Sequence, residues 1–309
     1  LPERVPSTTI DRQCGSSQQA VAFAAQGIRA GAYDLVVASG LEHMTRVPMY
    51  SSTAGKQPFS EGLIGAYSGR LVHQGISAEL ISEKWGISRE DNDRFSVQSH
   101  LRAAQATAEG RFEREIVPIV VEGESGKEML SVDEGIRPDS SVEKLAQLKP
   151  AFKPDGVITA ANSSQITDGS AAVLVMSEEK AKELGLTPRA RFHAFALAGV
   201  DPVMMLTGPI PATTKVLDRA RMTLDQIDLV EINEAFSPVV LAWEKEHNAD
   251  MSKVNVNGGA IALGHPLGCS GARLTATLLN ELERTGGRWG LQTMCEGGGM
   301  ANAMIIERL

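Results

Sequence analysis

Two cysteines and a histidine, each placed among glycines, are the residues of this chain best suited to chemistry. Cys14 lies in the segment Asp-Arg-Gln-Cys-Gly-Ser-Ser, His265 in Gly-His-Pro-Leu-Gly, and Cys295 in Cys-Glu-Gly-Gly-Gly. A thiol that attacks a carbonyl carbon needs a base, and a second thiol can move a different proton. Glycines leave backbone N–H groups free to face a developing oxyanion. The three segments together predict covalent catalysis through a cysteine.

The surroundings of Cys14 favour a reactive thiol over a buried structural one. A β-prone run over residues 7–10 precedes it, and a helix is predicted over residues 16–29, closed by Gly31. The N-terminus of a helix carries partial positive charge, which we expect to lower the pKa of the thiol. Cys269 also lies at a predicted helix start, between Gly268 and Ser270, and is assigned no chemistry.

Three cysteines and a histidine could in principle hold zinc, but their spacing argues against it. They are scattered along the chain and include no Cys-x-x-Cys pair. Three cysteines are also too few for a disulfide framework, which favours a reducing compartment. No Walker-type phosphate loop, dinucleotide fingerprint or Gly-x-Ser-x-Gly elbow occurs, so a nicotinamide enzyme and a serine hydrolase are disfavoured.

The elements that must position these residues follow an α/β rhythm at both ends of the chain. Residues 44–165 interrupt it and read as an insertion over a core domain. Within this insertion, a capping box of Ser88 and Asp91 starts a helix. After the insertion, Thr213 or Thr214 is expected to cap the helix predicted over 214–220. Strands are predicted over 34–38 (buried), 115–121, 190–197, 228–232, 253–256 and 289–294, with Cys295 ending the last strand, and helices over 76–85, 88–110, 214–220 and 270–284.

A weak internal repeat supports two similar α/β halves. A shift of 255 residues places Cys14 on Cys269, Gly31 on Gly286, and the strand before Gly40 on the strand before Cys295. Both copies run from a cysteine through a helix and a glycine turn to a strand and a site loop. Functional residues then lie at strand ends and helix starts, as is common in α/β folds.

Composition and charge exclude several classes of protein. The chain has 309 residues, 42% of them hydrophobic and 22% charged, which is ordinary for a globular protein. A net charge of −8 argues against a general nucleic-acid binder. No apolar run approaches the roughly 20 residues needed to span a membrane. The chain begins at Leu1 without a methionine, so targeting is not judged from it.

With Asn233-Glu-Ala-Phe as a fourth segment, the chain resembles the thiolase family of acyl-CoA acyltransferases over nearly its whole length. The resemblance implies cleavage of a 3-ketoacyl-CoA by coenzyme A through a thioester on Cys14, reversibly as a Claisen condensation. Coenzyme A is then a co-substrate, and no cofactor or metal is bound permanently. The implied fold has five layers, built from two βαβαβαββ halves and a loop domain that binds coenzyme A. The domains would be residues 1–43 with 166–186 (an N-terminal core whose first part lies outside this sequence), 44–165 (the loop domain) and 187–309 (the C-terminal core).

The resemblance also assigns roles to individual residues. Cys14 matches the nucleophile, His265 its base, and Cys295 the second acid and base. Asn233 matches the residue that holds a water of one oxyanion hole with the histidine, and the N–H groups of Cys14 and Gly297 match the second hole. Coenzyme A contacts of relatives match Arg137, Phe152 and Ser164.

Finer features resemble the degradative branch of the family. Met49 follows Val47-Pro48 where many biosynthetic thiolases have histidine. The segment Gln74–Glu79 and the ending Cys295–Ala303 look like bacterial thiolases that act on steroid side chains. A homodimer or homotetramer is implied, with a cytoplasmic location in a bacterium; a mitochondrial or peroxisomal one stays open.

Two alternatives remain. A ketoacyl-synthase-like condensing enzyme would share Cys14 and one histidine, but would carry histidine or asparagine in place of Cys295. A non-catalytic acyl-CoA-binding protein of the same fold is the second. An acyl-transfer assay with coenzyme A and acetoacetyl-CoA separates them.

Overall fold

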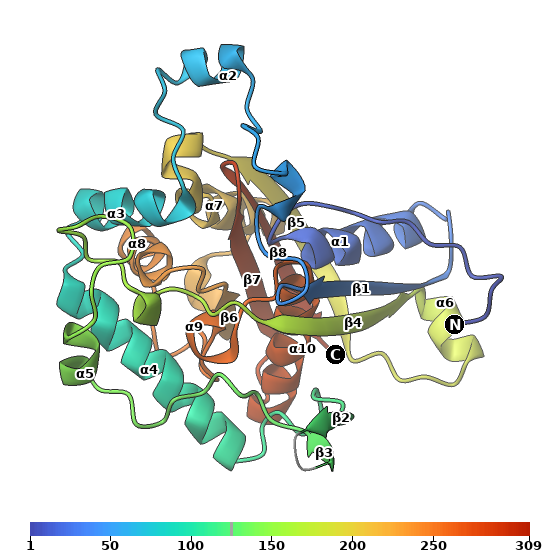
Figure 1. Cartoon of the computed structure of the whole chain (residues 1–309). Coiled ribbons are helices and arrows are strands. Elements are labelled where there is room, and N and C mark those ends of the chain that lie inside the picture. The colour runs from blue at the N-terminus through green and yellow to red at the C-terminus, as the bar shows by residue number, and fades with distance from the viewer. Residues whose placement is uncertain (124–125) are drawn as a thin grey trace.

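The computed structural model describes residues 1–123 and 126–309, and its core is a mixed four-stranded sheet (Figure 1). The strand order is β5-β8-β7-β6, in which β6 and β7 run parallel and the other neighbours run antiparallel. The strands are β5 (Ala190–Gly199), β6 (Leu229–Ile232), β7 (Trp289–Glu296) and β8 (Met300–Arg308). Strands β6 and β7 are buried along almost their whole length, as expected where helices cover both faces.

A second sheet pairs β1 (Leu35–His43) with β4 (Asp168–Met176) in antiparallel register. The predicted buried strand over 34–38 is longer than expected, and one of its faces is exposed. Leu35, Val37 and Leu41 project from that face, whereas Ala38 on the other face packs against helices. The alternation of strand side chains therefore buries only half of this strand.

Two helices lie between the sheets, α1 (Ser16–Arg29) and α10 (Leu267–Thr285). They pack against each other, and α10 contacts strands of both sheets. Their close approach depends on Gly271, because a Cβ there would lie 2.2 Å from the backbone nitrogen of Gln18. The two helices and the strands that follow them, β1 and β7, are the elements that the 255-residue repeat relates.

The outer face of the four-stranded sheet is covered by α7 (Pro209–Ala220), against which α8 (Ser237–His247) packs. The expectation that Thr213 or Thr214 caps this helix is wrong. The helix begins at Pro209, five residues before the predicted start at 214, because proline fits the first helical turn, where no N–H is needed. The Thr213 hydroxyl instead accepts a hydrogen bond of 2.9 Å from the buried Trp243 indole.

Residues 44–165 form the segment beside the core, with the Ser88–Asp91 capping box present as predicted (Figure 1). The strand predicted over 115–121 begins later, as one arm of a hairpin. The chain also contains the short 3₁₀ turns Ser51–Thr53, Ala160–Asn162, Pro202–Thr207 and Leu224–Gln226. The remaining elements are α2 (Glu61–Ala66), α3 (Gln74–Trp85), α4 (Arg89–Ala108), β2 (Ile119–Gly123), β3 (Gly126–Leu130), α5 (Val142–Ala146), α6 (Glu178–Glu183) and α9 (Ala260–Leu263).

Two predicted strands do not form. Residues 7–10 are irregular and largely exposed, because they pair with no strand among the described residues and a strand needs a partner for its backbone groups. Residues 253–256 make only one bridge, between Val254 and Val230. There the Asn255 side chain accepts from the Ile232 N–H at 2.9 Å and donates to the Ile232 carbonyl at 2.8 Å. These side-chain bonds take the place of the backbone hydrogen bonds that would extend the strand.

Strand β8 was not predicted, so β7 is not the last strand and Cys295 lies within it, paired with Ala301. The division into two core domains and a loop domain stays a prediction. No helix among the described residues is long and apolar enough to cross a membrane.

Candidate active site

The fold brings the three glycine-rich segments together around Cys14. This residue directly precedes Gly15, the N-cap of α1. It packs against Leu267, two residues after His265, and against Met294, which precedes Cys295. Cys14, His265 and Cys295 are all buried. Three segments separated by up to 281 positions therefore form one site (295 − 14 = 281).

The Cys14 thiol is not acidic in this site, contrary to the expectation from its place at a helix start. Burial and, to a smaller extent, the nearby Glu296 carboxylate raise its pKa to about 12. The N–H groups of Gly297 and of Cys14 itself bond the sulfur and lower the pKa, but by less. Desolvation of the charged form outweighs the partial charge of the helix end. Cys14 is thus a neutral thiol at rest.

Cys295 is electrostatically coupled to Cys14. Burial raises the pKa of Cys295 well above its usual value, and negative charge on Cys14 raises it further. Two thiols that influence each other in this way cannot both ionise readily. At most one of the two sulfurs is therefore expected to be ionised at a time.

The hydrogen bonds of His265 fix its tautomer. Ser270 Oγ donates its single proton to the Pro266 carbonyl at 2.9 Å. We therefore assign the contact of 2.6 Å between His265 Nδ1 and Ser270 Oγ to donation by Nδ1–H, because the hydroxyl has only one proton. This leaves Nε2 as the acceptor, and Asn233 Nδ2 lies 3.3 Å from it. The ring thus presents a lone pair, as a base requires.

His265 is also neutral. Burial and, to a smaller extent, the positive charge of Arg273 lower its pKa to about 3. A neutral imidazole can take the proton of a neutral thiol only when the attack itself makes the sulfur acidic. Proton transfer and attack are therefore expected to occur together.

Asn233 directly follows β6, and its backbone N–H donates to the carbonyl of Thr293 in β7 at 3.1 Å. The pairing of these parallel strands sets its side chain beside His265. Its Oδ1 is buried and has no partner among the described residues. The next residue, Glu234, is structural, because its carboxylate accepts bonds from Ser99, Asn255 and Ile261 N–H at 2.7–3.1 Å. It fixes the segment that precedes His265.

Two of the three predicted coenzyme A contacts lie beside this site. Ser164 N–H donates to the Ala235 carbonyl at 3.0 Å, and the Phe152 ring lies 5.9 Å from that of Phe236. Arg137 is exposed, and its bonds of 3.1 and 2.9 Å go to His100 and to the Gly135 carbonyl. The structure shows no contact between Arg137 and the cysteine segments.

Two residues that the sequence did not indicate, Tyr50 and His73, lie in line with the predicted coenzyme A contact Phe152. The three rings form an aromatic row with ring centroids 5.6 and 5.3 Å apart. Burial and the charge of Cys14 raise the pKa of Tyr50, so this row begins beside the nucleophile. No local sequence signal marks the row, because its members come from separate turns.

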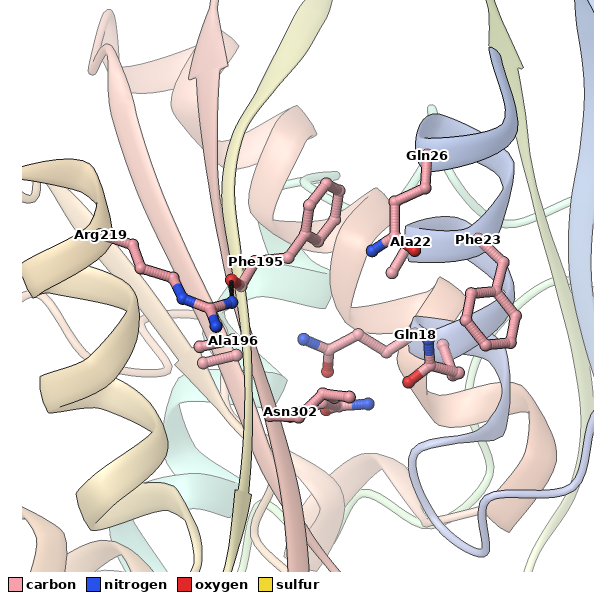
Figure 2. A pocket seen from close by; sticks show the side chains of 11 residues that line it. Gln18, Ala22, Phe23, Gln26, Phe195, Ala196, Arg219 and Asn302 are labelled. Atoms are coloured by element: carbon pink, nitrogen blue, oxygen red, sulfur yellow. Dashed lines mark hydrogen bonds between the residues drawn. The ribbon is translucent and has the colours of Figure 1, made fainter. Parts of the chain in front are cut away.

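A cavity of about 120 Å³ lies behind the site, between α1 and strands β5 and β8 (Figure 2). Gln18 of α1 and Asn302 of β8 line it, and none of the three cysteines does. Asn302 Nδ2 also donates to the carbonyl of Gly15 at 3.2 Å. No group of three or more histidine, cysteine or acidic side chains within the described ranges is placed to hold a metal ion.

Comparison with known proteins matches the whole chain to one family. The model of the thiolase N-terminal domain matches residues 1–179, and that of the thiolase C-terminal domain matches residues 186–308. The chain is 54% identical over 316 residues to the steroid 3-ketoacyl-CoA thiolase FadA6 of Mycobacterium tuberculosis, covering 100% of this chain and 76% of the relative. It is 45% identical over 317 residues to a 3-ketoacyl-CoA thiolase of Bacillus subtilis, covering 99% and 80%.

Solved structures agree. The human mitochondrial 3-ketoacyl-CoA thiolase superposes with a TM-score of 0.90 at 39% identity, covering 100% of this chain and 80% of that one. An acetyl-CoA acetyltransferase of Bacillus anthracis gives 0.89 at 42% identity, with the same coverage. Fold and relatives together define an acyl-CoA acyltransferase. The chain belongs to the thiolase family, as its four motifs predicted, and has the thiolase fold.

Proposed function

We propose that this enzyme cleaves 3-ketoacyl-CoA through a thioester on Cys14. In the first stage, the Cys14 sulfur attacks the 3-keto carbon while its proton passes to Nε2 of His265. The C2–C3 bond then breaks, and its electron pair goes to C2. Cys295 protonates this carbanion, which releases acetyl-CoA and leaves the shortened acyl group on Cys14. The thioester divides one difficult step into two easier ones.

In the second stage, coenzyme A collects the acyl group. The Cys295 thiolate takes the proton of the incoming coenzyme A thiol, whose sulfur attacks the thioester carbon. The Cys14–acyl bond breaks, and His265 returns its proton to the Cys14 sulfur. Every group then regains its starting protonation state, and the reverse order gives a Claisen condensation.

The observation that carries this proposal is the coupling of two buried thiols, together with a buried, neutral imidazole on the segment whose Leu267 packs against Cys14. The N–H groups of Cys14 and Gly297 both reach the Cys14 sulfur, which supports a role for them as donors to a thioester oxyanion. Asn233 and His265 lie 3.3 Å apart and support a second oxyanion site. Coenzyme A would pass Phe152 and Ser164, and Arg137 is assigned to it by resemblance alone.

Deuterium exchange tests the division of labour. Cys295→Ser is expected to form the acyl intermediate on Cys14 but to exchange the α-protons of acetyl-CoA very slowly, because a hydroxyl is a much poorer base than a thiol. Cys14→Ser should fail at acylation, and His265→Ala should impair both stages. Cys269→Ala is the matched control and should keep most activity. Exchange by Cys295→Ser at the parent rate would overturn the assignment of the acid and base.

We propose a bulky, apolar acyl group, with steroid-like 3-ketoacyl-CoA as the leading class. The aromatic row of Tyr50, His73 and Phe152 supports this, since stacked rings suit an apolar ligand. The relative from Mycobacterium tuberculosis is named as a steroid thiolase. The test compares kcat/KM for acetoacetyl-CoA, a long-chain and a steroid-bearing ketoacyl-CoA. A preference for acetoacetyl-CoA would contradict the proposal.

The remaining assignments follow from this mechanism and from the family. Because Cys14 and Cys295 must both be thiols, we propose a reducing compartment such as a bacterial cytoplasm. The resemblance to thiolases supports a homodimer or homotetramer, which analytical ultracentrifugation measures. It also supports the proposed domains, 1–43 with 166–186, 44–165 and 187–309.

A further inference from the structure

An ion pair with a buried carboxylate lies close to both cysteines. Glu296 follows Cys295 at the end of β7, precedes Gly297, and has a fully buried side chain. Its Oε2 lies 2.9 Å from Nε of Arg12, which is two residues before Cys14. The contact lacks the angle of a hydrogen bond, and neither carboxylate oxygen has another partner among the described residues. Arg12 is therefore the group that balances this charge.

The carboxylate also touches the turn that carries the nucleophile. A Cβ on Gly15 would lie 2.1 Å from Glu296 Oε1, so the carboxylate occupies the space that this glycine leaves. The turn is held by bonds of its own, from Gly15 N–H to the Arg12 carbonyl at 3.1 Å and from Arg12 N–H to Ser16 Oγ at 2.9 Å. The ion pair thus joins two segments 284 positions apart (296 − 12 = 284).

The sign of the charge makes this arrangement unusual for a thiol enzyme. A carboxylate beside a sulfur opposes formation of the thiolate, and Glu296 acts in this way on both Cys14 and Cys295. The Arg12 guanidinium lies 2.9 Å from the carboxylate and carries the opposite charge, so it opposes the effect of Glu296 on the sulfurs. Either charge alone would displace the protonation equilibrium of both thiols.

We propose that Arg12 and Glu296 are positioning residues that act as one neutral unit behind the two cysteines. Glu296 holds the end of β7 against the Cys14 turn and so directs the Gly297 N–H at the sulfur. Arg12 cancels the charge that this contact introduces. The proposal rests on the roles of Cys14 and Cys295 proposed above, and it adds the groups that set their charge balance.

Iodoacetamide alkylation of Cys14, located by peptide mass spectrometry, tests the charge balance without requiring turnover. Glu296→Gln leaves Arg12 unpaired, which favours the thiolate, so alkylation at pH 8 should become at least about threefold faster for a pKa decrease of one unit. The double variant Arg12→Gln/Glu296→Gln removes both charges and should return to near the parent rate. Arg12→Lys keeps the charge and should also stay near it.

The exposed pair of Arg94 and Glu90 provides the matched control, since Glu90→Gln with Arg94→Gln should leave alkylation unchanged. A merely structural role predicts slower or unchanged alkylation in Glu296→Gln and no recovery in the double variant, and either result would overturn the proposal. The double variant should also show a lower kcat for acetoacetyl-CoA thiolysis, because Gly297 is less firmly held. An unchanged kcat would overturn the positioning part.

The parent enzyme supplies a second measurement that does not depend on a variant folding. Burial raises the pKa of Glu296 to about 7, against the opposing effect of Arg12. As the pH rises through 7, the carboxylate becomes charged and makes the Cys14 thiol less acidic. The alkylation rate should therefore rise less steeply around pH 7 than on either side, and a straight line of full slope would contradict the proposal.

Three other groups are electrostatically coupled to the Cys14 sulfur, namely Glu42, Cys295 and Tyr50. The pKa values of Cys295 and Tyr50 are raised, so these two groups do not titrate around pH 7. His265 stays neutral throughout, because its pKa is about 3. If acetyl-CoA fails to acylate Cys14 in the parent, the proposed function fails, whereas the alkylation rates still decide whether the ion pair sets the charge balance.

Discussion

Removal of the Ser270 hydroxyl is expected to slow acylation without removing any group that touches the substrate. The hydroxyl accepts from His265 Nδ1–H at 2.6 Å and donates to the Pro266 carbonyl at 2.9 Å. In Ser270→Ala, both partners are left unsatisfied in a buried site. The ring can then carry its proton on Nε2 and donate it to the unpartnered Oδ1 of Asn233, once that amide turns over. In that tautomer His265 cannot accept the Cys14 proton.

The magnitude follows from the cost of an unsatisfied buried group, about 1–3 kcal/mol. If that energy stabilises the productive tautomer, acylation should slow by about 5- to 150-fold, since 1.36 kcal/mol is about tenfold in rate. The assay is single-turnover acylation of Cys14 by acetyl-CoA, read by mass spectrometry after an acid quench. Nitrogen-15 chemical shifts of His265 report the tautomer in the same samples.

Thr275→Val is the matched control, because Thr275 Oγ1 bonds the Gly271 carbonyl on the same helix at 2.8 Å but does not contact His265. It should lower the unfolding temperature and leave acylation near the parent rate. Acylation by Ser270→Ala at the parent rate would refute the tautomer argument. An equal loss in both variants would show that helix stability, rather than the tautomer, limits the reaction.

Three further predictions concern burial and metal. The pKa of His265 is lowered from its unfolded value near 6.5 to about 3. Between pH 3 and 6.5, His265 is therefore protonated in the unfolded state and neutral in the folded state. The free energy of unfolding should therefore fall as the pH drops below 6.5, by up to about 1.4 kcal/mol per pH unit from this group, and urea titrations at pH 5 and 7 should show a smaller loss in His265→Ala. Gly15→Ala should lower stability by about 1–3 kcal/mol and abolish acylation, because the new Cβ would lie 2.1 Å from Glu296 Oε1; calorimetry and the acylation assay measure both. Treatment with a chelator should leave thiolysis unchanged, and activity lost together with stoichiometric zinc would support the Cys/His ligand reading.

The sequence by itself determined the family and the residues that carry its chemistry. The segments around Cys14, Asn233, His265 and Cys295 are short and specific, and three of them contain glycine, so they can be recognised without knowing how they meet. Helix periodicity predicted α1 and α10, and the capping box predicted the start of α4. The strand over 253–256 could not be excluded in this way, because what ends it is the side chain of Asn255 bonding a strand that is distant in sequence.

Only the tertiary structure decided the electrostatics of the site. The helix start at Cys14 predicted an acidic thiol, yet burial and Glu296 raise its pKa to about 12. Likewise, the tautomer of His265 depends on a bond to Ser270, and the charge balance depends on a pair between Arg12 and Glu296. The burial of a side chain and the distances between charges are set by tertiary packing, as in the pair of Arg12 and Glu296. Local sequence patterns give neither quantity, so packing sets the protonation state of each reactive group.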